Sequence, residues 1–115
     1  MSNNSSSSDK APWITYRPEL KVLDCTVRDG GLINDHKFTD EFVRAVYDTC
    51  IAAGIDSMEI GYKNSEGLFP RDQFGNWRHC REEDIRRVVG DHDEASTGLK
   101  LVAMADAGKS DWQTV

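Results

Sequence analysis

The apolar positions of the first half of the chain predict a strand followed by a helix. Leu20 to Asp24 is a short apolar run with β-branched residues after it, which is typical of a buried strand. From Thr39 to Ala53 apolar residues recur at helical spacing, and Gly54 follows where a helix needs a left-handed residue to end. Either Thr39 or Asp40 can cap the start of this helix. The helical apolar positions are Phe42, Val43, Val46, Tyr47, Cys50 and Ile51.

The second half repeats this alternation with a long interruption. Ile55 to Gly61 predicts a second strand, and residues 62–80 lose periodicity and contain Gly67, Pro70 and Gly75, which indicates a long loop. Loops of such length in a small domain are usually functional or mobile. The remaining segments read as a short helix over Glu82 to Val89 closed by Gly90, a polar connection over Asp91 to Gly98, and a third strand over Leu99 to Ala105.

This order predicts an α/β fold with parallel strands joined by right-handed crossovers. The strands are apolar runs, which fits a parallel sheet covered on both faces. Three strands leave unpaired edges and a small core, so the chain reads as part of a larger fold.

Composition narrows the class of protein. Residues 1–12 form a Ser- and Asn-rich tail that is expected to be disordered, and residues 13–115 hold the folded part. No secretory signal or membrane-length apolar segment is present, so we expect a cytoplasmic protein.

A net charge of -6 argues against nucleic-acid binding, and the basic cluster Arg78 to Arg87 is interleaved with acids, as on a solvated helix face. Cys25, Cys50 and Cys80 are far apart and are expected to be reduced, mostly buried thiols.

The chemistry concentrates at the end of the first strand, in Asp24-Cys25-Thr26-Val27-Arg28-Asp29-Gly30-Gly31. A carboxylate just beyond a strand, next to glycines, suits a divalent metal, which makes Asp29 a candidate ligand. Arg28 could neutralise negative charge on a substrate oxygen. The alternative is a plain turn at Asp29-Gly30 with Arg28 paired on the surface.

The stretch Leu23 to Gly31 resembles the first-strand motif of the pyruvate carboxyltransferase-like metallolyases. That superfamily holds isopropylmalate and homocitrate synthases, hydroxymethylglutaryl-CoA lyase and 4-hydroxy-2-oxovalerate aldolase. The segment Gly54 to Gly61 is similar to the second strand of the family, in which a glutamate follows a helix-ending glycine; here it is Glu59. The resemblance implies the first three βα units of a TIM (β/α)8 barrel that is incomplete in this chain.

The resemblance also assigns roles. Asp29 would be a metal ligand, Arg28 would stabilise an enolate-like transition state, and Glu59 would be an acidic residue pointing into the site. A buried strand carboxylate such as Glu59 is costly unless it is paired or metal-bound. The implied cofactor is Mg²⁺ or Mn²⁺ in the complete barrel, and the implied substrate is a small 2-oxo acid handled by aldol or Claisen-type chemistry.

The chain departs from the family pattern at three points. Leu32 occupies a position where the synthases show a glutamine and the oxovalerate aldolases a histidine. The paired metal-binding histidines of a late strand have no counterpart, because His36, His79 and His92 are isolated. The five remaining barrel strands are absent.

For the other polar residues, the sequence gives weaker support for a place in the site. His36 and the run Asp91 to Glu94 are predicted to face solvent, whereas Lys63, Asn64 and Arg71 are candidates for the mouth of the site.

Two functions stay open on the sequence. The first is the N-terminal part of a metal-dependent aldolase or carbon–carbon lyase, inactive as this piece. The second is a non-catalytic interaction module that docks on a partner chain or on a second copy that completes the barrel. A small flavodoxin-like ligand binder is weaker, because no glycine-rich phosphate motif opens the first helix.

Overall fold

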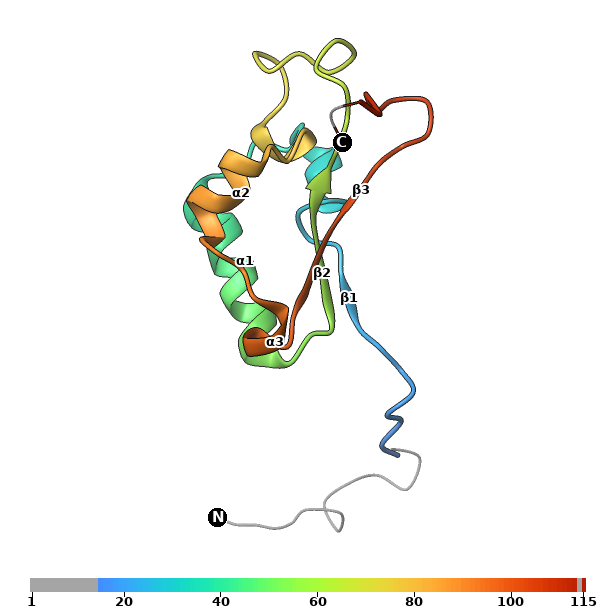
Figure 1. Ribbon diagram of the computed structural model, residues 1–115, viewed down its shortest axis with the longest axis vertical. Coiled ribbons are helices and arrows are strands. Elements are labelled where there is room, and N and C mark those ends of the chain that lie inside the picture. The colour runs from blue at the N-terminus through green and yellow to red at the C-terminus, as the bar shows by residue number, and fades with distance from the viewer. Residues whose placement is uncertain (1–14, 114) are drawn as a thin grey trace.

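A computed structural model describes residues 15–113 and 115, and the predicted tail over residues 1–12 lies outside them. Its centre is a three-stranded sheet in the order β1-β2-β3, with every pairing parallel. The strands are β1 (Leu23–Asp24), β2 (Ser57–Tyr62) and β3 (Lys100–Met104). The predicted parallel pairing is therefore confirmed, with β2 in the middle (Figure 1).

The strand bounds differ from those predicted. The first strand is two residues long, although the carbonyl of Val22 still accepts hydrogen bonds from the backbone of Asp56 and Ser57. The second strand starts two residues later than expected and continues through Tyr62. These shifts arise because pairing partners far away in the sequence decide where a strand ends, and the apolar run alone does not show them.

The long helix α1 (Asp40–Ala53) forms where its periodicity predicts it. The Thr39 hydroxyl accepts a hydrogen bond from the Phe42 amide at 3.1 Å, which resolves the choice of cap in favour of Thr39. Gly54 ends the helix in the left-handed region at φ 74°.

The helix α2 (Glu82–Val89) has the predicted bounds, and Gly90 follows it. The polar connection predicted over residues 91–98 contains a short helix that was not predicted, α3 (Glu94–Thr97), which Asp93 caps. Two short 3-10 turns, η2 (Gly30–Ile33) and η3 (Asn76–Arg78), lie in the segments that follow β1 and β2.

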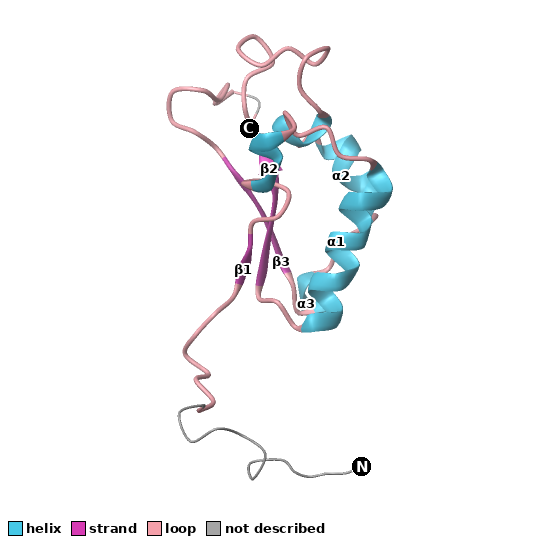
Figure 2. Ribbon diagram, turned by 180° about the vertical axis from the view of Figure 1, so that it is seen from behind, coloured by secondary structure: helices cyan, strands magenta, loops and turns pink. Residues whose placement is uncertain are grey.

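The helices α1, α2 and α3 lie on one side of the sheet in both views (Figures 1 and 2). The core between them and the strands includes the fully buried side chains of Val43, Met58, Ile60 and Trp77. The expectation of a parallel sheet covered on both faces is wrong for the described residues, since their helices cover one face only. Among the described residues no helix covers the other face, and β1 and β3 are the edge strands of the sheet.

The expectation of reduced, mostly buried thiols is confirmed. Cys25, Cys50 and Cys80 are free thiols, and Cys50 and Cys80 are buried. None of the helices over residues 15–113 and 115 combines the length and apolar character that a membrane span requires.

Candidate functional site

Side-chain alternation on β2 separates the core from the candidate site. Met58 and Ile60 belong to the apolar core on the helix side of the sheet. Because successive strand residues point to opposite faces, Glu59 projects to the other face. Glu59 as a whole is nevertheless only 8% exposed to solvent. A carboxylate in that position needs a cationic partner to offset its lost hydration.

Arg28 provides that partner from the turn after β1. Its Nε lies 3.0 Å and its terminal nitrogen 2.8 Å from the same Glu59 oxygen, Oε1. The two side chains are 17% and 10% exposed. The sequence prediction that Glu59 must be paired or metal-bound is thus met by a charged pair. The alternative, a surface turn in which Arg28 is paired on the surface, is therefore wrong for Arg28.

Asp29 lies on the solvent side of this pair, next to Arg28. Its side chain is 65% exposed, and its Oδ1 lies 3.4 Å from the guanidinium of Arg28. Over residues 15–113 and 115, no three His, Cys, Asp or Glu side chains come together in a group that could hold a metal ion. Asp29 can therefore offer one oxygen ligand, and the residues described do not form a metal centre by themselves.

His36 is the main correction to the predicted site. It was expected to face solvent, but it is fully buried, and its Nε2 lies 2.7 Å from the carbonyl oxygen of Arg28. Because a carbonyl only accepts, Nε2 carries the proton. Desolvation lowers the pKa of His36, so the neutral ring is favoured. His36 thereby holds the backbone of Arg28 in place.

Two glycines make room for His36. A Cβ on Gly31 would lie 2.2 Å from the imidazole ring, and one on Gly75 would lie 1.8 Å from the carbonyl oxygen of His36. The sequence shows both glycines but does not show that both contact His36, because Gly75 lies in the long loop after β2. Long-range packing of this kind leaves no local pattern in the sequence.

Tyr62, the last residue of β2, is a site residue that the sequence analysis missed. It is 7% exposed, and its ring lies edge-on to His36 and within 5.8 Å of the Arg28 guanidinium carbon. Hydrogen bonding to Tyr62 and to Glu59 raises the pKa of Arg28, so the guanidinium stays charged. The only hint in the sequence was its place directly after the predicted strand.

The interpretation of the basic cluster as a solvated helix face is wrong for Arg78. Its guanidinium stacks over Tyr62, Phe69 and Phe74, at 4.3 Å from the Phe69 ring centre. It also donates a hydrogen bond from Nε to Asn64 Oδ1 at 2.9 Å. Arg78 thus fastens the long loop to the end of β2.

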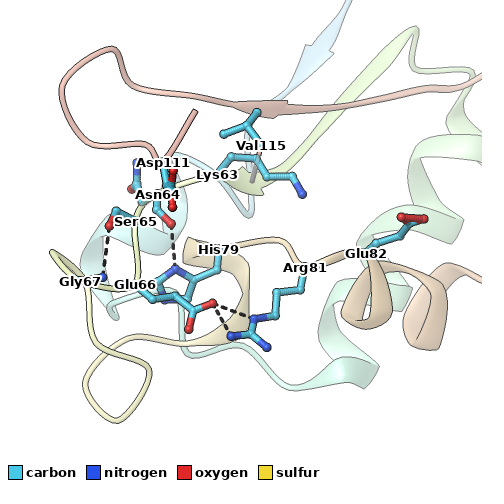
Figure 3. Close-up of a pocket in the computed structure, with 10 residues that line it drawn as sticks. All are labelled: Lys63, Asn64, Ser65, Glu66, Gly67, His79, Arg81, Glu82, Asp111 and Val115. Atoms are coloured by element: carbon cyan, nitrogen blue, oxygen red, sulfur yellow. Dashed lines mark hydrogen bonds and ion pairs between the residues drawn. The ribbon is translucent and has the colours of Figure 1, made fainter. Parts of the chain in front are cut away.

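A pocket of about 640 Å³ lies beyond the carboxyl end of β2 (Figure 3). Arg28, Asp29 and Glu59 do not border this pocket, whereas Lys63 and Asn64, the candidates for the mouth of the site, line it. Arg71 does not; its terminal nitrogen donates to Asn76 Oδ1 at 2.8 Å. His79 was given no role by the sequence, yet it borders the same pocket and is 5% exposed.

The remaining candidates contribute less. Leu32, which replaces the polar residue of the family, is 51% exposed and brings no polar group to the site. In the run Asp91 to Glu94, the acids are exposed as expected. His92 departs from that expectation, because its Nδ1 lies 2.8 Å from the Tyr47 hydroxyl.

Comparison with known proteins gives one informative similarity. The chain is 34% identical over 88 residues to oxaloacetate decarboxylase of Mycobacterium tuberculosis (strain ATCC 25618 / H37Rv). The matched part is 76% of this chain and 25% of that enzyme, so the chain spans about a quarter of the relative's length. No protein-family model and no solved structure matches the chain.

Proposed function

We propose that this chain forms the first three βα units of a (β/α)8-barrel lyase that cleaves or forms a carbon–carbon bond of a 2-oxo acid. Three parallel strands with their helices on one side are what the opening segment of such a barrel would contain. Similarity to a decarboxylase of oxaloacetate, itself a 2-oxo acid, supports the reaction class.

The Arg28–Glu59 pair is the observation that carries this proposal. It joins the turn after β1 to the middle of β2. Strand alternation places Glu59 opposite the core residues Met58 and Ile60, on the face that the helices leave open (Figure 2). In (β/α)8 enzymes that inner face, toward the carboxyl ends of the strands, is where the reactive groups gather. A guanidinium held on that face is aimed at substrate and is not part of the core.

The guanidinium can stabilise negative charge that develops in the reaction. When the bond next to the carbonyl of a 2-oxo acid breaks, its electron pair moves toward the carbonyl oxygen and an enolate forms. N–H groups of Arg28 would donate hydrogen bonds to that oxygen. Glu59 would fix the guanidinium plane, and His36 would fix the backbone that carries it.

The metal remains a prediction for the complete barrel. Asp29 is a suitable oxygen ligand for Mg²⁺ or Mn²⁺, but a full site needs donors that residues 15–113 and 115 do not bring together. We therefore expect the 115-residue chain to be inactive on its own.

The test is decarboxylation of oxaloacetate, measured as pyruvate formation with Mn²⁺ present. The material is the natural polypeptide or assembly that carries this chain, purified through a tag on it. We expect activity that falls at least about 100-fold in Arg28→Ala, the usual cost of removing a donor to a developing oxyanion. Arg86→Ala is the matched control, because Arg86 is a 63% exposed arginine on α2. Equal activity of the two variants would contradict the role of Arg28.

A second candidate is the interaction module. It is favoured by the open edge at β1, where Val22 and Leu23 are about half exposed (53% and 50%). This function predicts that Arg28→Ala leaves binding of the partner unchanged and that no lyase activity accompanies the tagged chain.

A further inference from the structure

A β-bulge in β2 places Tyr62 on the same face of the sheet as Glu59. Glu59 is paired with Val102 of β3 and Tyr62 with Met104, so three steps along β2 lie opposite two steps along β3. One extra residue reverses the alternation of side chains beyond it, and bulges often re-aim a side chain next to a reactive site. Without the bulge, Tyr62 would share the core-facing side of Ile60. With it, Tyr62 lies on the face that the described helices leave open (Figure 2).

Gly61 is the residue that makes this bulge possible. Its φ of 155° lies in a region that residues with side chains rarely adopt. A Cβ at this position would lie 2.1 Å from the carbonyl oxygen of Trp77 and 2.6 Å from Cys80 Sγ. The segment around η3 therefore packs directly against the Gly61 backbone, and this contact holds the bulge and the direction of Tyr62 in place.

The ring of Tyr62 is held by three neighbours. His36 packs edge-on against it, with 5.3 Å between the two ring centroids. The guanidinium carbons of Arg28 and Arg78 lie 5.8 Å and 5.2 Å from the centroid of the Tyr62 ring. These contacts fix where the hydroxyl of Tyr62 lies.

The hydroxyl of Tyr62 has a proton that the fold does not use. The hydroxyl oxygen accepts a hydrogen bond from Arg28, because a guanidinium can only donate. No acceptor for the phenolic O–H is found among residues 15–113 and 115. A tyrosine that served packing alone would not need this hydroxyl, since phenylalanine would make the same ring contacts.

We propose that Tyr62 is a catalytic residue that gives its hydroxyl proton to the carbon atom of the enolate. The inference rests on the proposed function, in which Arg28 donates hydrogen bonds to the enolate oxygen. Because Arg28 also donates to the Tyr62 hydroxyl, one guanidinium would hold the proton donor beside the reacting atoms.

In this step the O–H bond of Tyr62 breaks and a C–H bond forms at the carbon from which carbon dioxide has left. The electron pair of the enolate double bond makes the new bond, and the enolate oxygen becomes the carbonyl oxygen of the product. Tyr62 is left as a phenolate, which keeps its hydrogen bond from Arg28 and regains a proton from water.

The experiment measures the exchange of the methyl hydrogens of pyruvate for deuterium in heavy water, by mass spectrometry. This exchange runs the protonation step backwards and needs no cleavage of a carbon–carbon bond. The material is the natural polypeptide or assembly that carries this chain, with Mn²⁺ present. Release of carbon dioxide from oxaloacetate is measured on the same preparations, against a protein-free blank.

Tyr62→Phe keeps the ring and its packing and removes only the hydroxyl. We expect exchange to fall at least about 100-fold, the usual contribution of general acid–base catalysis, and carbon dioxide release to fall less than about tenfold, because bond cleavage precedes proton transfer. Arg28→Ala should lower both rates, since an enolate forms in both reactions. Tyr16→Phe is the matched control, because Tyr16 is 82% exposed, and it should change neither rate.

Two results overturn the inference. One is exchange that survives Tyr62→Phe, and the other is a loss of carbon dioxide release in step with exchange, which would make Tyr62 only a support for Arg28. Decarboxylation with exchange that does not depend on Tyr62 would refute this inference alone. Tyr62-dependent exchange without decarboxylation would refute the proposed lyase function alone, and a wild type that shows neither activity would refute both.

Discussion

At the scale of single residues, the clearest signal in the sequence is a carboxylate inside an apolar strand. Glu59 sits between two core residues of a buried strand, and such a group requires a partner. The sequence therefore predicted that a partner exists, and the structure identifies it as Arg28. His36 could not be placed in the same way. Its burial depends on Gly31 and Gly75, and the second of these lies 39 positions further along the chain.

Glu59→Gln tests the pairing. The change keeps the size of the side chain but leaves the charge of Arg28 without its buried partner, which should lower the free energy of unfolding by about 2–3 kcal/mol. Urea denaturation followed by circular dichroism measures the loss. Glu82→Gln removes an acid that is 72% exposed and should leave the urea midpoint unchanged. A Glu59→Gln protein as stable as the wild type would show that the ion pair does not contribute to stability.

At the scale of elements, the helices were predicted better than the strands. The bounds of α1 and α2 follow from periodicity and from the local chemistry of Thr39, Gly54 and Gly90. The length of β1 depends on its neighbour β2, so the apolar run over Leu20 to Asp24 overestimated it. Helix α3 was missed because four residues are too few to show a period.

Thr39→Ala tests the local origin of α1. Removing the hydroxyl leaves the Phe42 amide without its cap, which should cost about 1 kcal/mol of unfolding free energy. Thr49→Ala is the control in the same helix, since Thr49 is exposed and alanine has the higher helix propensity, so this change should be neutral or slightly stabilising. Equal losses in the two variants would mean that the cap contributes nothing specific, as judged by thermal or urea unfolding.

At the scale of the whole molecule, the sheet is covered by helices on one side and has two open edges. The sequence predicted the parallel order but also a second covered face, because an apolar strand does not reveal what covers it. One-sided cover is what a segment of a closed barrel has before its other strands are added. We therefore propose that the Arg28–Glu59 face lies on the inside of a larger barrel.

The most direct test of that claim is a chimera with the relative from Mycobacterium tuberculosis. The quarter of that oxaloacetate decarboxylase that aligns with this chain is replaced by the matching 88 residues, and pyruvate formation from oxaloacetate is measured. We expect an active chimera that loses at least about 100-fold in kcat/KM on Arg28→Ala and little on Arg86→Ala. A folded chimera that is inactive, or one that tolerates Arg28→Ala as well as Arg86→Ala, would contradict that claim.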